Sequence, residues 1–167
     1  MRTVVITGAT GGIGIHTAIG VARTGARVIV TGRLEQRCRA GDLQQQLLAN
    51  RVLEVGRIAH RQDERARAAD DAIGIVDVEV HFAVNVIAPY LLTQRLMPAL
   101  EAAVPARVVY VTGGSKSGPI DPADLQSQQG FSTWSAYNTT KRAMESMVLA
   151  QAGEMESRGV FLNVVYP

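Results

Sequence analysis

A tyrosine and a lysine lie four residues apart in the carboxyl-terminal part of the sequence, at Tyr137 and Lys141. In a helix, this spacing places the two side chains one above the other on the same face. The pKa of a phenol in water is near 10. Lowering it to about 7, where the group could exchange a proton at neutral pH, requires that the phenolate be stabilised by about 4 kcal/mol. A positive charge about 4 Å away supplies on the order of that energy at an effective dielectric of about 20. The pair is therefore suited to acid/base chemistry, and an ordinary surface pair on a helix is the alternative.

Three glycines, Gly8, Gly12 and Gly14, follow a short β-branched run near the amino terminus. Residues 3–6 predict a buried strand, and the spacing of apolar residues after the glycines predicts a helix that ends at Gly25. A strand, a glycine turn and a helix form the context that a dinucleotide-binding fingerprint requires. Gly8 would allow the sharp turn, Gly12 the approach of backbone N–H groups to a pyrophosphate, and Gly14 close packing of the helix. An ordinary glycine-rich turn is the alternative.

A second strand is predicted at residues 27–31, and it is followed by Gly32 and Arg33. In nucleotide-binding folds of this kind, an acidic residue after the second strand binds the ribose hydroxyls of NAD, whereas an arginine suits the 2′-phosphate of NADP. No acidic residue occupies positions 31–33. The segment therefore favours NADP(H), with NAD(H) as the second choice, and a solvent-exposed loop arginine is the alternative reading.

Together, these residues resemble the short-chain dehydrogenase/reductase family, whose glycine motif has the same Gly-x-x-x-Gly-x-Gly spacing. Further blocks follow in the family's order, at residues 81–93, 107–112, 124–127, 137–141 and 160–165. The Asp-Leu-Gln-Ser segment at 124–127 is most similar to the retinol-dehydrogenase-like branch. The resemblance implies an α/β fold of the Rossmann type, a doubly wound, mostly parallel sheet with helices on both faces. It implies a single dinucleotide-binding domain over residues 1–167, shortened in its middle and incomplete at its carboxyl end.

The resemblance also implies roles for individual residues. Tyr137 would be the general acid in carbonyl reduction, and the base in the oxidative direction. Lys141 would hold the nicotinamide ribose and stabilise the phenolate, and Asn85 would anchor a water that relays protons. The residues implied in cofactor binding are Gly8, Thr10, Gly12, Ile13, Gly14 and Arg33, together with Tyr137 and Lys141.

One departure from the family pattern concerns the catalytic serine. The family's serine, which binds the substrate carbonyl, should follow the strand at residues 107–112, and alignment on that strand places Gly113 at its position. Ser115 is the nearest serine, and it could serve from the loop or be an ordinary loop hydroxyl. Loss of one such donor typically lowers the rate about 100- to 1000-fold.

A second departure concerns the interval between Arg33 and Asn85, which is shorter than in the family and lacks its Asn-Asn-Ala-Gly strand motif. Weak strands are predicted at residues 51–55 and 72–76. The high content of Arg, Ala and Gln in this interval indicates a deletion or a stretch of coding sequence that is out of frame. A basic nucleic-acid patch is the competing reading, weakened by interspersed acidic residues and by a lack of aromatic residues. The sequence also stops at Pro167, before the family's substrate-covering segment.

The composition is that of a globular protein. The 167 residues are 47% hydrophobic and 19% charged, and the net charge of +2 implies no nucleic-acid partner. A single cysteine, Cys38, suits a cytoplasmic protein, and the three histidines have no metal-ligand spacing, so no metal is expected. No apolar run reaches the length of a membrane span. The lone Trp134 is expected to pack in the core rather than line a substrate pocket.

The sequence therefore predicts an NADP(H)-dependent oxidoreductase of the short-chain dehydrogenase/reductase type. It would transfer hydride between the nicotinamide and a small carbonyl or alcohol, using Tyr137, Lys141, Asn85 and Ser115. The alternative is a catalytically impaired relative that serves only as a nucleotide-binding or oligomerising module. A homo-oligomer is implied as a possibility by the resemblance, through the helices that carry Asn85 and Tyr137.

Overall fold

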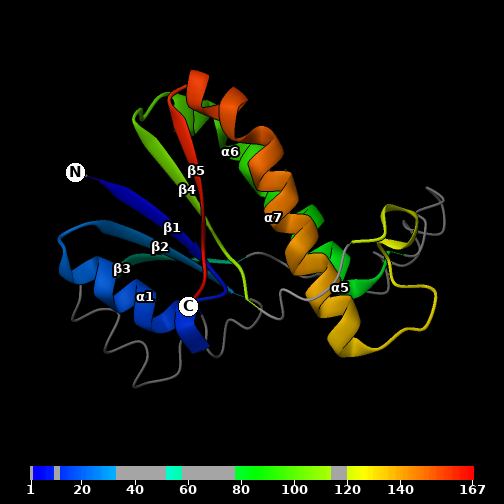
Figure 1. Ribbon diagram of the computed structural model, residues 1–167. Coiled ribbons are helices and arrows are strands. Elements are labelled where there is room, and N and C mark those ends of the chain that lie inside the picture. The colour runs from blue at the N-terminus through cyan, green and yellow to red at the C-terminus, as the bar shows by residue number, and fades with distance from the viewer. Residues whose placement is uncertain (1, 10–11, 33–51, 58–77, 114–119) are drawn as a thin grey trace, which may run out of the picture. The chain divides into compact units, whose positions relative to one another are not determined.

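The structure is a computed structural model that describes residues 2–9, 12–32, 52–57, 78–113 and 120–167 (Figure 1). The chain divides into two compact units, an amino-terminal unit Met1–Ile75 and a carboxyl-terminal unit Val76–Pro167. The expectation of one dinucleotide-binding domain over the whole chain stays a prediction.

Three parallel strands form the sheet of the amino-terminal unit, in the order β1-β2-β3. They are β1 (Thr3–Thr7), β2 (Arg27–Gly32) and β3 (Val52–Arg57). The strands predicted at 3–6, 27–31 and 51–55 are thereby confirmed, whereas 72–76 lies outside the described residues. The prediction that the first strand is buried is wrong, since Val5 is 43% exposed. Among the described strands, β1 pairs only with β2.

Helix α1 (Gly12–Arg23) packs on this sheet. Ala18 and Ala22 lie four residues apart and therefore on one face, where they are buried with Val28 and Val30 of β2. The predicted end of the helix is confirmed at Gly25, whose φ of +81° is the left-handed conformation that glycine adopts readily. Small alanines thus allow the helix to approach the sheet closely behind the glycine turn.

The carboxyl-terminal unit begins with three helical pieces that follow one another without a break. They are α5 (Val80–Phe82), a π-helical turn η1 (Ala83–Ile87) and α6 (Ala88–Glu101). The Glu79 carboxylate caps the start by accepting hydrogen bonds from the backbone N–H groups of His81 and Phe82, at 2.9 and 2.8 Å. The helix predicted at residues 81–93 is confirmed, but its π-helical turn was not expected.

Two parallel strands, β4 (Ala106–Val111) and β5 (Val160–Val165), form the second sheet. A short 3-10 turn η2 (Pro122–Asp124) and the long helix α7 (Thr133–Ser157) connect them. The predicted strands at 107–112 and 160–165 are confirmed.

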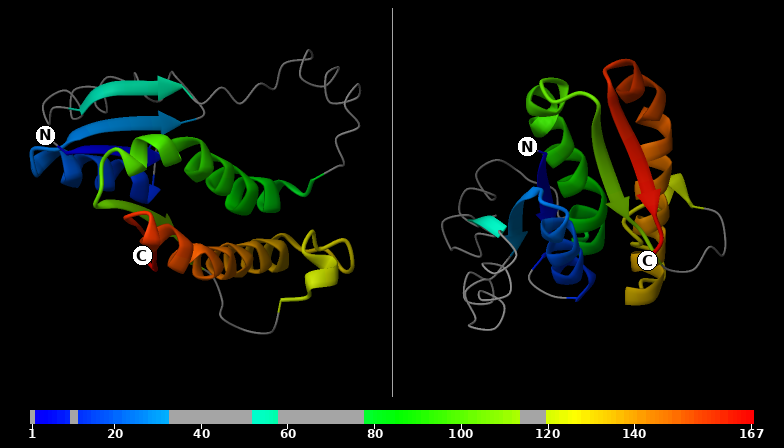
Figure 2. Two further views of the ribbon diagram at one scale, coloured as in Figure 1. Left: turned by 90° about the horizontal axis from the view of Figure 1, so that it is seen from above. Right: turned by 90° about the vertical axis from the view of Figure 1, so that its left-hand side faces the viewer.

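Helices α6 and α7 pack against the same face of β4 and β5, as two views show (Figures 1 and 2). Met97 of α6 and Met155 of α7 meet the beginning of the strands, at Ala106 and Val160. Farther along, Tyr110 of β4 is buried beside α7, and its hydroxyl is 2.7 Å from the Thr93 hydroxyl of α6. This packing fixes α7 over the carboxyl ends of the strands.

The described elements thus confirm an α/β fold with parallel strands. The strands lie in two small sheets, one in each unit, and the described helices of each unit cover one face of its own sheet. An incomplete Rossmann-type arrangement accounts for both features.

Candidate functional site

Tyr137 and Lys141 lie one turn apart on α7, as their spacing predicts. The helix begins after Ser132, whose hydroxyl accepts a hydrogen bond from the backbone N–H of Ser135 at 3.1 Å. The Lys141 Nζ lies 5.8 Å from the centroid of the Tyr137 ring. The phenol and the ammonium therefore share one face of the helix and one local environment.

Lys141 is also tied to the second sheet. Its ammonium donates a hydrogen bond to the carbonyl oxygen of Val111, the last residue of β4, at 3.1 Å. Burial lowers the pKa of Lys141 from the ordinary value of 10.5, because a partly desolvated ammonium loses part of its hydration. The charge is thus held at the carboxyl end of a parallel strand, which is where ligands bind in open α/β sheets.

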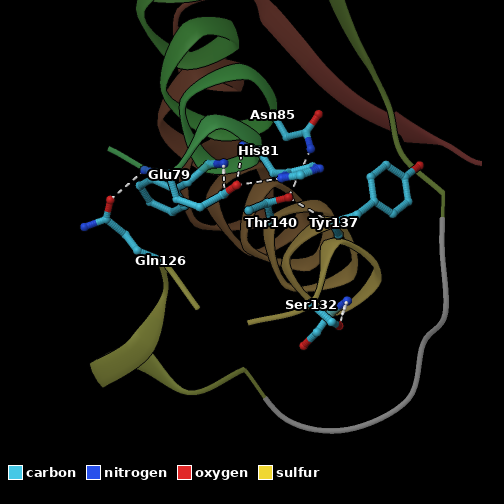
Figure 3. Close-up of polar contacts among 9 residues, drawn as sticks. Glu79, His81, Asn85, Gln126, Ser132, Tyr137 and Thr140 are labelled. Atoms are coloured by element: carbon cyan, nitrogen blue, oxygen red, sulfur yellow. Dashed lines mark hydrogen bonds and ion pairs between the residues drawn. The ribbon is translucent and has the colours of Figure 1, made fainter. Parts of the chain in front are cut away.

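Asn85 lies in the π-helical turn and reaches α7 through Thr140 (Figure 3). Its side-chain N–H donates to the Thr140 hydroxyl at 3.0 Å, and that hydroxyl donates to the backbone carbonyl of Tyr137 at 2.9 Å. Thr140 is fully buried. A π-turn inserts one extra residue into a helix and often marks a functional site. Here the turn carries the side chain that binds to the Tyr137 turn of α7.

The predicted position of the family's serine lies beside the phenol. A β-carbon added at Gly113 would lie 3.4 Å from the Tyr137 hydroxyl oxygen. The preceding hydroxyl, on Thr112, is buried and donates to the Glu145 carboxylate at 2.6 Å, so it is occupied elsewhere. Ser115 lies outside the described residues. The assignment of Gly113 to the position of the family's serine stays a prediction.

The glycine turn of the amino-terminal unit has the expected backbone shape. Gly8 and Gly12 have φ of +68° and +54°, and a β-carbon at either position would meet no atom within 4 Å. A β-carbon at Gly14 would instead lie 2.5 Å from the Gly8 carbonyl oxygen. The first two glycines therefore adopt the left-handed turn beside open space, and the third allows α1 to pack on the turn.

Residues near the end of β2 lie beside the glycine turn. The backbone N–H of Ala9 donates to the Thr31 carbonyl at 3.2 Å, which ties the turn to β2. The Thr31 hydroxyl is buried and has no hydrogen-bond partner in the described part of the chain, and Ile13 is 54% exposed at the second position of α1. The predicted cofactor residues Thr10 and Arg33 lie outside the described residues.

These features fit a dinucleotide. The turn offers open space at two glycines beside the start of α1, and the Thr31 hydroxyl, which has no hydrogen-bond partner among the described residues, lies near the carboxyl end of β2. In the carboxyl-terminal unit, Tyr137, Lys141 and Gly113 lie together, and Asn85 binds to the same turn of α7.

Trp134 was expected in the core, but it is 65% exposed on the first turn of α7. The described residues hold no group of three or more His, Cys, Asp or Glu side chains suited to a metal ion. No described helix is long and apolar enough to cross a membrane.

Sequence reasoning missed Thr140 and Glu145. Thr140 could have been found, because a residue three positions after Tyr137 lies on the same side of a helix. Glu145 had a similar signal, since it follows Lys141 at the next turn. Its partner Thr112 lies 33 residues away, so the hydrogen bond itself depends on tertiary packing.

Comparison with known proteins identifies the family. Residues 4–166 match the profile of the NAD dependent epimerase/dehydratase family. The sequence is 27% identical to Retinol dehydrogenase 13 of Mus musculus over 192 residues, covering 99% of this chain and 58% of that protein. It is 32% identical to Dehydrogenase/reductase SDR family member 13 of Homo sapiens over 193 residues, covering 99% and 51%. The chain thus spans little more than half the length of these curated relatives.

A solved structure supports the same fold. A metagenomic short-chain oxidoreductase crystallised in complex with NADP has a TM-score of 0.69 and 23% sequence identity. The match covers 99% of this chain and 81% of that one. The family profile, the curated relatives and the fold agree. The chain belongs to the NAD dependent epimerase/dehydratase family, among the short-chain dehydrogenases and reductases, a family of oxidoreductases with retinol-dehydrogenase-like members.

Proposed function

We propose that this protein is an NADP(H)-dependent oxidoreductase that transfers hydride between the nicotinamide and a small carbonyl or alcohol. The observation that carries this function is the Lys141 ammonium 5.8 Å from the Tyr137 ring, at the carboxyl end of β4. A cation held there places positive charge beside the tyrosine whose hydroxyl is proposed to exchange a proton with the substrate oxygen.

The cofactor would be held by the glycine turn and by the pair on α7. Gly8 and Gly12 leave room for the pyrophosphate, Gly14 brings the start of α1 close, and Ile13 flanks the same turn. Thr10, two positions before Gly12 in the sequence, is proposed as a further cofactor contact. Absence of an acidic residue at positions 31–33, with Arg33 as the charge for a 2′-phosphate, supports NADP(H) over NAD(H). The nicotinamide, when bound, supplies or accepts the hydride.

The residues of α7 handle the proton. In reduction, the Tyr137 hydroxyl donates its proton to the carbonyl oxygen while hydride adds to the carbonyl carbon, and in oxidation the phenolate takes that proton back. Lys141 supplies the positive charge beside the tyrosine ring. Asn85 anchors the relay that reprotonates the tyrosine, and its orientation is set by Thr140. Ser115 is the nearest candidate for the second donor to the carbonyl.

A specific observation favours a second candidate, a module that binds nucleotide without turnover. Gly113 occupies the position beside the Tyr137 hydroxyl where the family has a serine, and the Thr112 hydroxyl is bound to Glu145. With no second donor at that position, an oxidoreductase of this type would be slowed about 100- to 1000-fold. The nucleotide-binding turn is unaffected by that loss.

One titration separates the two candidates. The purified chain is titrated with NADPH while nicotinamide fluorescence is recorded, and a panel of ketones and aldehydes is then added to the saturated complex. Binding followed by loss of NADPH supports the oxidoreductase, and binding without loss supports the module. Absence of binding overturns both. A parallel titration with NADH tests the cofactor preference, which is contradicted if NADH binds as tightly as NADPH.

Two further proposals concern the cellular compartment and the oligomeric state. The single cysteine suits a reducing compartment, so we place the protein in the cytosol. Helices α6 and α7 expose Leu91 and Leu149, and a second copy of the chain is expected to bind there. Sedimentation of the purified chain tests this association, and a monomer at high concentration would contradict it.

A further inference from the structure

Trp134 is a large apolar side chain left in solvent on the first turn of α7. It is 65% exposed. Its ring stacks beside that of Tyr137, with 6.0 Å between ring centroids and 23° between ring planes. An aromatic pair in this geometry fixes the orientation of both rings. One face of the indole stacks beside the proposed proton donor, and the described residues leave much of the rest of its surface uncovered.

Gly113, which follows β4, is a neighbour of the Tyr137 hydroxyl, and it brings no side chain there. A β-carbon at this position would already lie 3.4 Å from the phenol oxygen. Lys141 lies along the helix on the other side of the tyrosine, one turn farther from the amino-terminal end of α7. The indole stacks beside the ring that carries the Tyr137 hydroxyl, so it is the apolar surface next to a carbonyl whose oxygen binds there.

We propose that Trp134 is a specificity-determining residue, which favours substrates whose carbonyl carries an aromatic ring. The indole is a flat apolar surface beside the proton donor. A flat ring conjugated to the carbonyl lies in the carbonyl plane and can stack on it, whereas a saturated ring is puckered and makes fewer close contacts. This role rests on the proposed function, since it takes Tyr137 as the group that binds the substrate oxygen.

The size of the preference can be stated in advance. A pair of aromatic rings gains free energy beyond what the buried area alone provides. This extra free energy corresponds to about 2- to 13-fold in affinity. We therefore expect aryl compounds to bind about 2- to 13-fold more tightly than saturated-ring compounds of the same size. Matched pairs are 1-phenylethanol with 1-cyclohexylethanol, and acetophenone with cyclohexyl methyl ketone.

Trp134 is the only tryptophan in the chain, so its fluorescence reports on this position alone. The protein is saturated with NADP⁺, which is transparent at the exciting wavelength, and each alcohol is titrated in turn. The expected result is a saturable shift of the indole emission to shorter wavelength, with the phenyl compound acting at lower concentration. An emission that does not move with either alcohol overturns the role of Trp134.

A set of variants tests the preference without requiring turnover. Ligand-observed NMR gives the dissociation constants of both alcohols for the wild type, Trp134→Leu and Trp134→Phe. Trp134→Leu is expected to remove the aryl preference, whereas Trp134→Phe keeps most of it. Phe131→Leu is the matched control, because Phe131 is 56% exposed near the same end of α7 and should leave the preference unchanged. A preference that survives in Trp134→Leu contradicts the assignment.

Failure of the proposed function is distinguishable from failure of this role. Nicotinamide fluorescence measures NADPH affinity in the wild type and in each variant. A wild type that does not bind NADPH refutes the proposed function and the role of Trp134 together. Retained NADPH binding with equal affinity for the two alcohols refutes only the role of Trp134. Where turnover is present, the ratio of kcat/KM for acetophenone to that for cyclohexyl methyl ketone should fall about 2- to 13-fold in Trp134→Leu.

Discussion

Gly113 lies against the hydroxyl end of Tyr137, at a distance where a β-carbon would be 3.4 Å from the phenol oxygen. The position is therefore large enough for a small side chain, although its φ of +155° is one that other residues rarely adopt. A serine here would bring a second hydroxyl to the oxygen of a bound carbonyl. It would also strain the backbone, at a cost of about 1–3 kcal/mol.

Gly113→Ser is thus expected to raise kcat about tenfold or more, because one positioned donor is typically worth about 100- to 1000-fold and the strain removes part of that gain. The melting temperature should fall. Gly113→Ala is the control, since it has the same strain and no hydroxyl. Equal rates for the serine and alanine variants would show that this position does not contact the substrate oxygen.

Thr140 connects Asn85 to the Tyr137 turn, and its hydroxyl has no access to water. Thr140→Val keeps the shape and removes both hydrogen bonds, so the free energy of unfolding should fall by about 1–3 kcal/mol. Thr140→Ser should lose less. Denaturant unfolding of Thr140→Val, Asn85→Ala and the double variant measures the coupling, expected at about 0.5–3 kcal/mol. Strictly additive effects would mean that the two side chains do not stabilise each other.

Gly14 and Gly20 form a matched pair within α1. A β-carbon at Gly14 would lie 2.5 Å from the Gly8 carbonyl oxygen, whereas one at Gly20 would meet nothing within 4 Å. Gly14→Ala should therefore weaken NADPH binding and lower the free energy of unfolding by about 1–3 kcal/mol. Gly20→Ala should raise that free energy by about 0.5–1 kcal/mol and leave NADPH affinity unchanged. Similar NADPH affinities in the two variants would argue against the turn as the nucleotide site.

Lys141 links stability to pH. Burial lowers its pKa below 10.5, so between the lowered pKa and 10.5 the unfolded chain holds a proton that the native chain has released. The contribution of this group to the free energy of unfolding therefore rises with pH between the lowered pKa and 10.5. At neutral pH, the native state bears the full cost of burying the Lys141 ammonium.

Lys141→Met should accordingly melt at a higher temperature than the wild type at pH 7, with the difference shrinking toward pH 10, and should lose turnover. Thermal unfolding at both pH values measures this difference. An advantage for Lys141→Met that grows with pH would reverse the sign of the burial effect.

Local sequence patterns predicted most of the helices and strands, because the signals for these elements lie in adjacent residues. The β-branched run of β5 predicts its bounds at Val160–Val165, and Gly25 predicts the end of α1. The close approach at Gly14 follows from the motif for the same reason. Whether β1 is covered cannot be read from its own residues, since burial depends on which strands and helices lie beside it.

The parts of the site that escaped prediction depend on contacts between distant residues. The Asn85–Thr140 hydrogen bond joins positions 55 residues apart. A π-turn adds a single residue to a helix and leaves the apolar pattern almost unchanged, so residues 83–87 read as ordinary helix. Trp134 was assigned to the core by residue type, but its burial depends on which elements lie beside the first turn of α7.

Tyr137→Phe tests the central claim most directly, because it removes only the hydroxyl that is proposed to carry the proton. The variant and the wild type are compared for NADPH affinity by nicotinamide fluorescence and for turnover of a carbonyl substrate by loss of NADPH. Turnover should fall by about 100-fold or more, with NADPH affinity within a few-fold of the wild type. Turnover in Tyr137→Phe equal to that of the wild type would contradict the role of the phenol.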